Sequence, residues 1–217
     1  ALMHDDVYAQ ADPLVIGDRR VLERTIAALG LPLEIQTVAD IGDATFSPGT
    51  VTVLDLDNAD PATFAVGEES AVAGGAAVDY VFRACDLAMA GDVDAIVTAP
   101  LNKAAMHMAG YTYAGHTELL TERTNAQRVS MLLIGPGLRI VHVSTHVSLA
   151  EAIARVTPQR VEEVIQLAHD ACRSLGIAEP RIAVAGLNPH ASEGGILGNQ
   201  EAESIAPAIA AARARGL

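Results

Sequence analysis

Short β-rich runs alternate with helical patterns along the chain, and this alternation constrains the fold more than any other feature of the sequence. The runs that predict strands cover residues 13–16, 33–38, 50–54, 93–98, 129–134, 139–144 and 181–185. Helical patterns cover residues 19–29, 70–90 and 200–215, and a further helix begins near residue 157. Strands separated by helices predict an α/β fold with a mostly parallel sheet covered on both faces. The turn at residues 135–137 adds a predicted hairpin.

The predicted helices have clear local start and stop signals. Gly30 and Gly91 follow two of the helical patterns, as expected for glycine just after a helix C-terminus. Thr157 and Pro158 open another helix, with a capping hydroxyl followed by a proline in the first turn. These signals predict helix boundaries without any tertiary information.

Composition and charge exclude several classes of function. Hydrophobic residues make up 50% of the 217 residues but aromatic residues only 3%, so the predicted core is aliphatic. The net charge of −13 argues against nucleic acid or an anionic membrane surface as a partner. No run approaches the ~18 apolar residues that a membrane span needs. The two cysteines, Cys85 and Cys172, lie in helical patterns and are predicted to be buried thiols, which fits a cytoplasmic protein.

Four polar segments follow predicted strands or open predicted helices. They are residues 98–103, 115–118, 144–146 and 188–195. Parallel sheets bind ligands in the crevice beyond the carboxyl ends of their strands, so these segments are the candidates for chemistry. The sequence contains no GxGxxG loop, no phosphate-binding P-loop and no CxxC pair, so the cofactor does not follow from motif spacing.

His146 and His190 are the candidate metal ligands. Neutral imidazole is a common nitrogen ligand for divalent metal ions, and both histidines lie near the ends of predicted strands. The alternative is that each is a hydrogen-bonded structural residue. His190 favours the ligand interpretation because it precedes a glycine-rich loop, which lets the backbone approach a ligand closely. His142 lies inside its predicted strand and is interpreted as a core histidine with satisfied hydrogen bonds.

The segment Gly115-His116-Thr117-Glu118 has two interpretations. Thr117 could cap the helix that follows, which would explain this residue without any function. Alternatively, the backbone N–H groups at the helix start, together with His116 and the Thr117 hydroxyl, would hold an anion such as phosphate. Lys103 also has two interpretations, as a partner for an anion or as a solvated helix residue.

Together these segments resemble one known family. The strings "VDAIVTAPLNK", "GHTELL", "STH" and "LNPHASEGGILGNQE", with "DPLVIGD" near the start, are similar to the 4-hydroxythreonine-4-phosphate dehydrogenase family of vitamin B6 biosynthesis. The resemblance implies an α/β fold like that of isocitrate and isopropylmalate dehydrogenases, with two α/β domains and an active-site cleft at the interface of a homodimer. It also implies that His116 and Thr117 contact a phosphorylated substrate. His146 and His190 would bind a divalent metal ion: zinc, magnesium, manganese or cobalt.

The activity implied by the resemblance is an oxidation coupled to decarboxylation. With NAD or NADP as cofactor, 4-phosphooxy-L-threonine would be converted to 3-amino-2-oxopropyl phosphate. One alternative within the family is a D-threonate or D-erythronate 4-phosphate dehydrogenase, which gives dihydroxyacetone phosphate. An alternative of another class is a non-catalytic module that binds a phosphorylated ligand.

The resemblance further implies that residues 1–217 cover only parts of both domains. The family's opening strand and its "GDPAGIGPE"-like loop are expected before Ala1. A third metal-binding histidine, in a segment resembling "YHDQG", is expected after Leu217. The remaining substrate-binding residues and most of the nicotinamide site are expected in that same later part.

Overall fold

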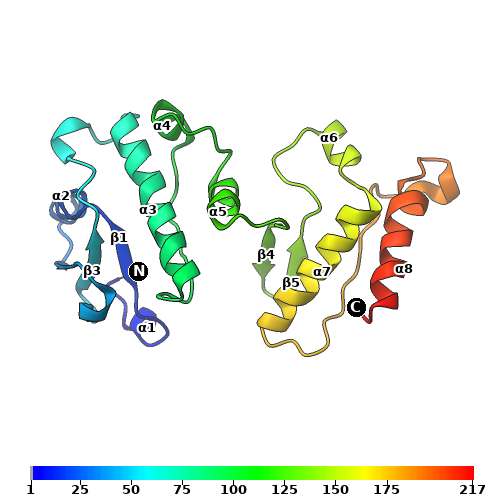
Figure 1. The fold of residues 1–217 in the computed structure, drawn as a ribbon, viewed down its shortest axis with the longest axis horizontal. Helices are drawn as coiled ribbons and strands as arrows, with labels where there is room; N and C mark the ends of the chain where they lie inside the picture. Colours follow the sequence, from blue (N-terminus) through cyan, green and yellow to red (C-terminus); the bar gives the residue numbers. More distant parts are fainter. Residues whose placement is uncertain (1) are drawn as a thin grey trace. The chain divides into compact units, whose positions relative to one another are not determined.

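Three of the predicted strands form one parallel sheet. In the computed structural model, which describes residues 2–217, these strands are β1 (Leu14–Gly17), β2 (Glu34–Val38) and β3 (Thr50–Asp55). Their order is β1-β3-β2, and both pairings are parallel. Figure 1 labels β1 and β3 of this sheet. The central strand β3 is buried over residues 51–54. Its nearly continuous apolar run fits a strand with both neighbours present in a parallel sheet.

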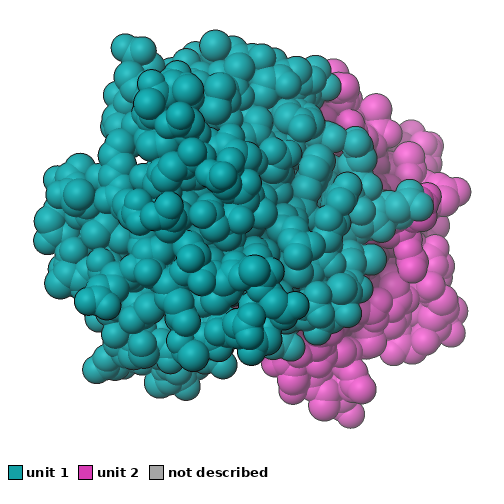
Figure 2. Space-filling view, turned by 60° about the vertical axis from the view of Figure 1, so that its left-hand side comes forward, with its two compact units in different colours: residues 1–126 teal, residues 127–217 magenta. Residues whose placement is uncertain are grey.

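The chain divides into a first unit, residues 1–126, and a second unit, residues 127–217 (Figure 2). Besides the sheet, the first unit contains α1 (Asp5–Tyr8), α2 (Arg19–Leu29), α3 (Ala71–Ala90), α4 (Lys103–Met108) and α5 (His116–Thr124). Short 3-10 turns lie at Ile41–Asp43 and Pro61–Thr63. Helix α2 ends at Gly30, whose φ of 59° allows the left-handed C-cap that the sequence predicts.

One hydrophobic core cluster of the first unit lies where α3 packs against α4 and α5. Its buried members are Val78, Val81, Met106 and Leu119. Helices α3 and α4 approach closely at Gly74, where an added methyl group would overlap the carbonyl group of Ala105. At the neighbouring Gly75 an added methyl group would meet its nearest neighbour at 3.6 Å, an ordinary contact. Gly74 therefore sets the distance between the two helices.

The second unit contains a hairpin and several helices. Strands β4 (Leu132–Gly135) and β5 (Leu138–Val141) pair antiparallel, which confirms the predicted hairpin. The helices are α6 (Leu149–Ala154), α7 (Pro158–Ser174) and α8 (Ala206–Ala214), and a π-helical turn at Glu201–Ile205 leads into α8. Helix α7 starts at the predicted Thr157-Pro158 cap. Helices α7 and α8 pack through Val161, Ile165, Ala208 and Ala212.

Two predicted strands are extended segments that pair with no other strand in the described part of the chain. Residues 93–98 and 181–185 have no ladder assigned to them, so both strand predictions are wrong as stated. The reason is that a strand exists only through backbone hydrogen bonds to a neighbour, which a local pattern does not reveal. Ile182 and Val184 still alternate inward against the α7–α8 core, whereas Val97 is 96% exposed.

Both cysteines are free thiols. Cys85 is buried in α3 as predicted, and burial raises the pKa of its thiol. Cys172 is only partly buried, near the C-terminal end of α7, so the prediction of two buried thiols holds for Cys85 alone. Across residues 2–217, no helix combines the length and apolarity that crossing a membrane requires.

Candidate functional site

The predicted phosphate-binding pair lies at the start of α5. This helix begins at His116, and its N-cap is Gly115, which has no side chain to occupy the first-turn N–H groups. Thr117 lies inside the first turn and does not cap the helix, so the capping interpretation of Thr117 is wrong. The free N–H groups carry the positive end of the helix dipole, which favours an anion. Glu118 occupies the same turn, where its carboxylate would compete with a bound anion.

The first predicted metal ligand, His146, lies in the loop between β5 and α6. Strand β5 ends at Val141, earlier than predicted, so His146 follows the strand by several residues. Its side chain is exposed, and its φ of 56° is in the left-handed region. Non-glycine residues with this backbone conformation are uncommon, and they cluster at ligand and active sites, where the surrounding structure maintains the strain.

Two side chains hold the backbone around His190, the second predicted ligand. The Asn188 side-chain oxygen accepts a hydrogen bond from the His190 N–H at 2.9 Å, and the Asn188 amide donates to the carbonyl oxygen of Leu197 at 3.3 Å. The Glu201 carboxylate accepts from the Leu187 N–H at 2.8 Å. This bond lowers the pKa of Glu201. The loop that carries His190 is therefore tied to the turn that precedes α8.

A run of left-handed residues follows His190 directly. Ala191, Ser192 and Glu193 have φ values of 46°, 61° and 44°. Glu193 turns back toward the imidazole, and its carboxylate oxygen lies 2.6 Å from the His190 Nδ1. Ser192, the middle residue of this run, is buried.

The motif string "LNPHASEGGILGNQE" contains Asn188, Glu193 and Glu201, but the sequence alone predicts no role for any of the three. The spacing of Asn188 two residues before His190 is a signal for a side-chain-to-backbone turn and could have indicated its role. The roles of Glu193 and Glu201 depend on contacts across the loop and have no comparable local signal.

The two predicted ligand sets lie in different units. His116 and Thr117 belong to the first unit, and His146 and His190 to the second. Among the residues that the structure describes, no group of three or more histidine, cysteine or carboxylate side chains is arranged to hold a metal ion. A catalytic metal site needs about three protein ligands. His146 and His190 alone therefore do not complete a catalytic metal site.

His142, which the sequence predicts to be a core histidine, differs from its prediction. Its Nδ1 is buried and has no hydrogen-bond partner within residues 2–217, so the interpretation as a fully satisfied core histidine is wrong. Its backbone is bonded on both sides: its N–H donates to Met131 and its carbonyl accepts the Ser130 hydroxyl. Lys103 opens α4 and is exposed, without an ion pair to any described carboxylate.

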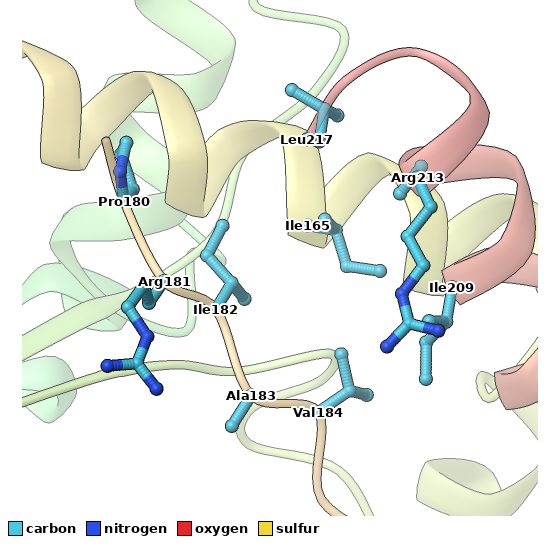
Figure 3. Close-up of a pocket in the computed structure, with 10 residues that line it drawn as sticks. Ile165, Pro180, Arg181, Ile182, Ala183, Val184, Ile209, Arg213 and Leu217 are labelled. Carbon is cyan, nitrogen blue, oxygen red and sulfur yellow. The ribbon is translucent and has the colours of Figure 1, made fainter. Parts of the chain in front are cut away.

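A groove of about 610 Å³ runs along the extended segment 180–184 in the second unit (Figure 3). Ile165 of α7 and Ile209 of α8 form its apolar walls, and Ile182 and Val184 complete them. None of the predicted site residues lines this groove. Its lining contains no histidine, aspartate or glutamate side chain, and its charged side chains are those of Arg181 and Arg213.

Comparison with known proteins identifies the class of α/β protein. The sequence model of the family described as "Pyridoxal phosphate biosynthetic protein PdxA" matches residues 9–217. A D-threonate 4-phosphate dehydrogenase from Cupriavidus necator is 45% identical over 217 residues, covering 100% of this chain and 65% of that protein. A 4-hydroxythreonine-4-phosphate dehydrogenase from Beijerinckia indica is 47% identical, covering 94% of this chain and 60% of that protein.

The fold agrees with the sequence comparison. A crystal structure of a 4-hydroxythreonine-4-phosphate dehydrogenase from Burkholderia phymatum superposes with a TM-score of 0.88 at 43% identity, covering 100% of this chain and 66% of that one. The chain belongs to the PdxA family. It spans slightly less than two thirds of the length of these relatives.

Proposed function

We propose that the protein is a nicotinamide- and metal-dependent dehydrogenase acting on a phosphorylated hydroxy acid. The observation that supports this most strongly is the family match over residues 9–217, together with relatives at 45% and 47% identity that are named as dehydrogenases of such substrates. The substrate alcohol would be oxidised to a ketone, with its hydride passing to NAD or NADP and its proton released. The resulting β-keto acid would then lose carbon dioxide.

In this proposal the start of α5 binds the substrate phosphate. The absence of a side-chain cap at Gly115 leaves the first-turn N–H groups free to donate to phosphate oxygens. His116 and the Thr117 hydroxyl would add further donors. Glu118 would have to rotate away from the turn on binding. Fixing the phosphate would position the carbon that loses hydride, which lies at the other end of a short, flexible substrate.

His146 and His190 would hold the metal ion, with a third ligand from outside the described residues. A bound divalent ion would act as a Lewis acid toward the substrate hydroxyl and the developing carbonyl oxygen. Imidazole ligands favour transition metals such as zinc and cobalt, and open water positions would also suit manganese or magnesium. The left-handed backbone at His146 and after His190 supports this assignment, because such strain is typical of ligand sites. By family resemblance, a homodimer would complete the active site.

Two classes of substrate are candidates, an amino acid ester and sugar-acid esters. Relatives named as 4-hydroxythreonine-4-phosphate dehydrogenase and as D-threonate 4-phosphate dehydrogenase match at similar identity. 4-Phosphooxy-L-threonine would give 3-amino-2-oxopropyl phosphate, and D-threonate or D-erythronate 4-phosphate would give dihydroxyacetone phosphate. The amino acid ester carries an amine at the carbon where the sugar-acid esters carry a hydroxyl.

The test is to assay the complete protein with each phosphate ester, using NAD⁺ and NADP⁺ and each of the four metals. Turnover of the amino acid ester supports a role in vitamin B6 synthesis, whereas turnover of the sugar-acid esters alone assigns the protein to the second activity. Saturable phosphate-ester binding without turnover of either class would support the non-catalytic alternative and refute the proposed dehydrogenase activity.

A further inference from the structure

We propose that Glu193 is a positioning residue for His190, and that its carboxylate determines which imidazole nitrogen is presented to the metal ion. The proposal rests on the metal site of the proposed function. The Glu193 carboxylate oxygen lies 2.6 Å from the His190 Nδ1, a short hydrogen bond, as bonds to an ionised group are. An ionised carboxylate can only accept, so the shared proton belongs to Nδ1. In a neutral imidazole this leaves the lone pair on Nε2, which is then the coordinating atom.

The backbone between the two residues supports this role. Glu193 reaches back to a ring three positions earlier because three successive non-glycine residues are left-handed, with Glu193 at φ 44° and ψ 50°. A loop that only had to turn would favour glycine at these positions. Such strain persists where the surrounding structure maintains it, and Ser192 in the middle of the run is buried.

The backbone of His190 is held independently of its side chain. Asn188 accepts from the His190 N–H, and Glu201 anchors the preceding Leu187. With the backbone held on one side and Nδ1 bonded on the other, Nε2 is the only ring nitrogen of His190 left to coordinate a metal. Bonds of this kind, from a ligand histidine to a carboxylate, orient the ring and raise its basicity.

The pair between Glu193 and His190 contributes little as a stabiliser of the fold. The side chains are 51% and 61% exposed, and exposed ion pairs add little to stability because water screens them. Removing the carboxylate should therefore change the tautomer of the His190 ring without unfolding the loop. The positioning role of Glu193 can then be tested separately from any structural role.

The experiment compares Glu193→Gln with two other variants of the complete protein. Glu179→Gln is the matched control, because Glu179 is an exposed carboxylate of the second unit with no hydrogen bond to another described residue. His190→Ala tests the metal site itself. Protein labelled with ¹⁵N-histidine is examined without metal by long-range ¹H–¹⁵N NMR, which identifies the protonated ring nitrogen. Zn²⁺ affinity is measured by competition with a chromophoric chelator.

Metal-free wild-type protein should have the His190 proton on Nδ1. In Glu193→Gln the population of this tautomer should fall and Zn²⁺ should bind about 10- to 100-fold more weakly, the usual effect of removing such a partner. Glu179→Gln should change neither quantity.

Two results would overturn the proposal, and they differ in what else they imply. If Glu193→Gln leaves the tautomer and Zn²⁺ affinity unchanged while His190→Ala abolishes binding, positioning by Glu193 is wrong and the metal site stands. If His190→Ala itself leaves Zn²⁺ affinity unchanged, the metal assignment and the positioning role both fail.

Discussion

Replacing Asp18 by asparagine should destabilise the first unit by about 2.5 kcal/mol at neutral pH. The Asp18 side chain is fully buried at the start of α2. The Arg20 guanidinium donates to both carboxylate oxygens, at 3.1 and 2.7 Å, and the backbone N–H groups of Arg20 and Ala59 donate at 2.9 and 2.8 Å. The bond from Arg20 is the main reason that the pKa of Asp18 is lowered from 3.8 to about 2. That difference corresponds to about 2.5 kcal/mol of stability.

The pH dependence gives the prediction a definite sign. The pKa of Asp18 is lower in the folded protein than in the unfolded chain, so the stabilisation is fully present above pH 3.8 and is lost as the pH falls toward 2. The difference in unfolding free energy between wild type and Asp18→Asn should therefore shrink over this window. Asparagine cannot replace the charge, and its amide would also place a donor against the surrounding donors.

Tyrosine fluorescence during urea unfolding is the appropriate assay. The chain has no tryptophan, and its tyrosines are Tyr8, Tyr80, Tyr111 and Tyr113. All of them belong to the first unit, so the signal follows the unit that contains Asp18. Asp40→Asn is the control, since Asp40 caps a single backbone N–H at an exposed turn and asparagine caps equally well. A loss below about 0.5 kcal/mol in Asp18→Asn, or a loss that is the same at pH 2 and pH 7, would refute the argument.

Three further predictions follow from the packing and the proposed site. Gly74→Ala should destabilise the first unit by about 1–3 kcal/mol in the same urea assay, because the methyl group overlaps the α4 backbone. Gly75→Ala should be neutral or stabilising by up to about 1 kcal/mol, and equal losses at both sites would contradict the close approach of the helices. Thr117→Val should raise KM for the phosphorylated substrate about tenfold or more with little change in kcat, as expected for losing one hydrogen bond to a charged group; an unchanged KM excludes the hydroxyl contact. His146→Ala should abolish metal binding, measured by metal analysis, and turnover, measured by NAD(P)H absorbance, whereas His142→Ala should keep both. Metal retained in His146→Ala would disprove the assignment of His146 as a metal ligand.

Interactions close along the chain made several parts of the fold predictable. The caps at Gly30 and at Thr157-Pro158 act within one turn of their own helices, so the bounds of α2 and the start of α7 agree with the sequence prediction. The same holds for the β4–β5 hairpin, whose turn residues adjoin the strands they connect. The motif strings indicated the PdxA family because they are characteristic in combination, and the family match confirmed it.

The tertiary structure decided what depends on residues far apart in the sequence. Residues 93–98 and 181–185 have strand composition, but whether they pair depends on a neighbouring strand and not on their own pattern. The absence of a cap on α5 could not be read from Thr117, because helix geometry places the cap at Gly115. The sequence by itself determined helices α2, α3 and α7, the hairpin and the family. The fold alone brought Glu201 to the loop of His190 and Asp18 to the N–H of Ala59, because these contacts join residues that only chain folding brings together.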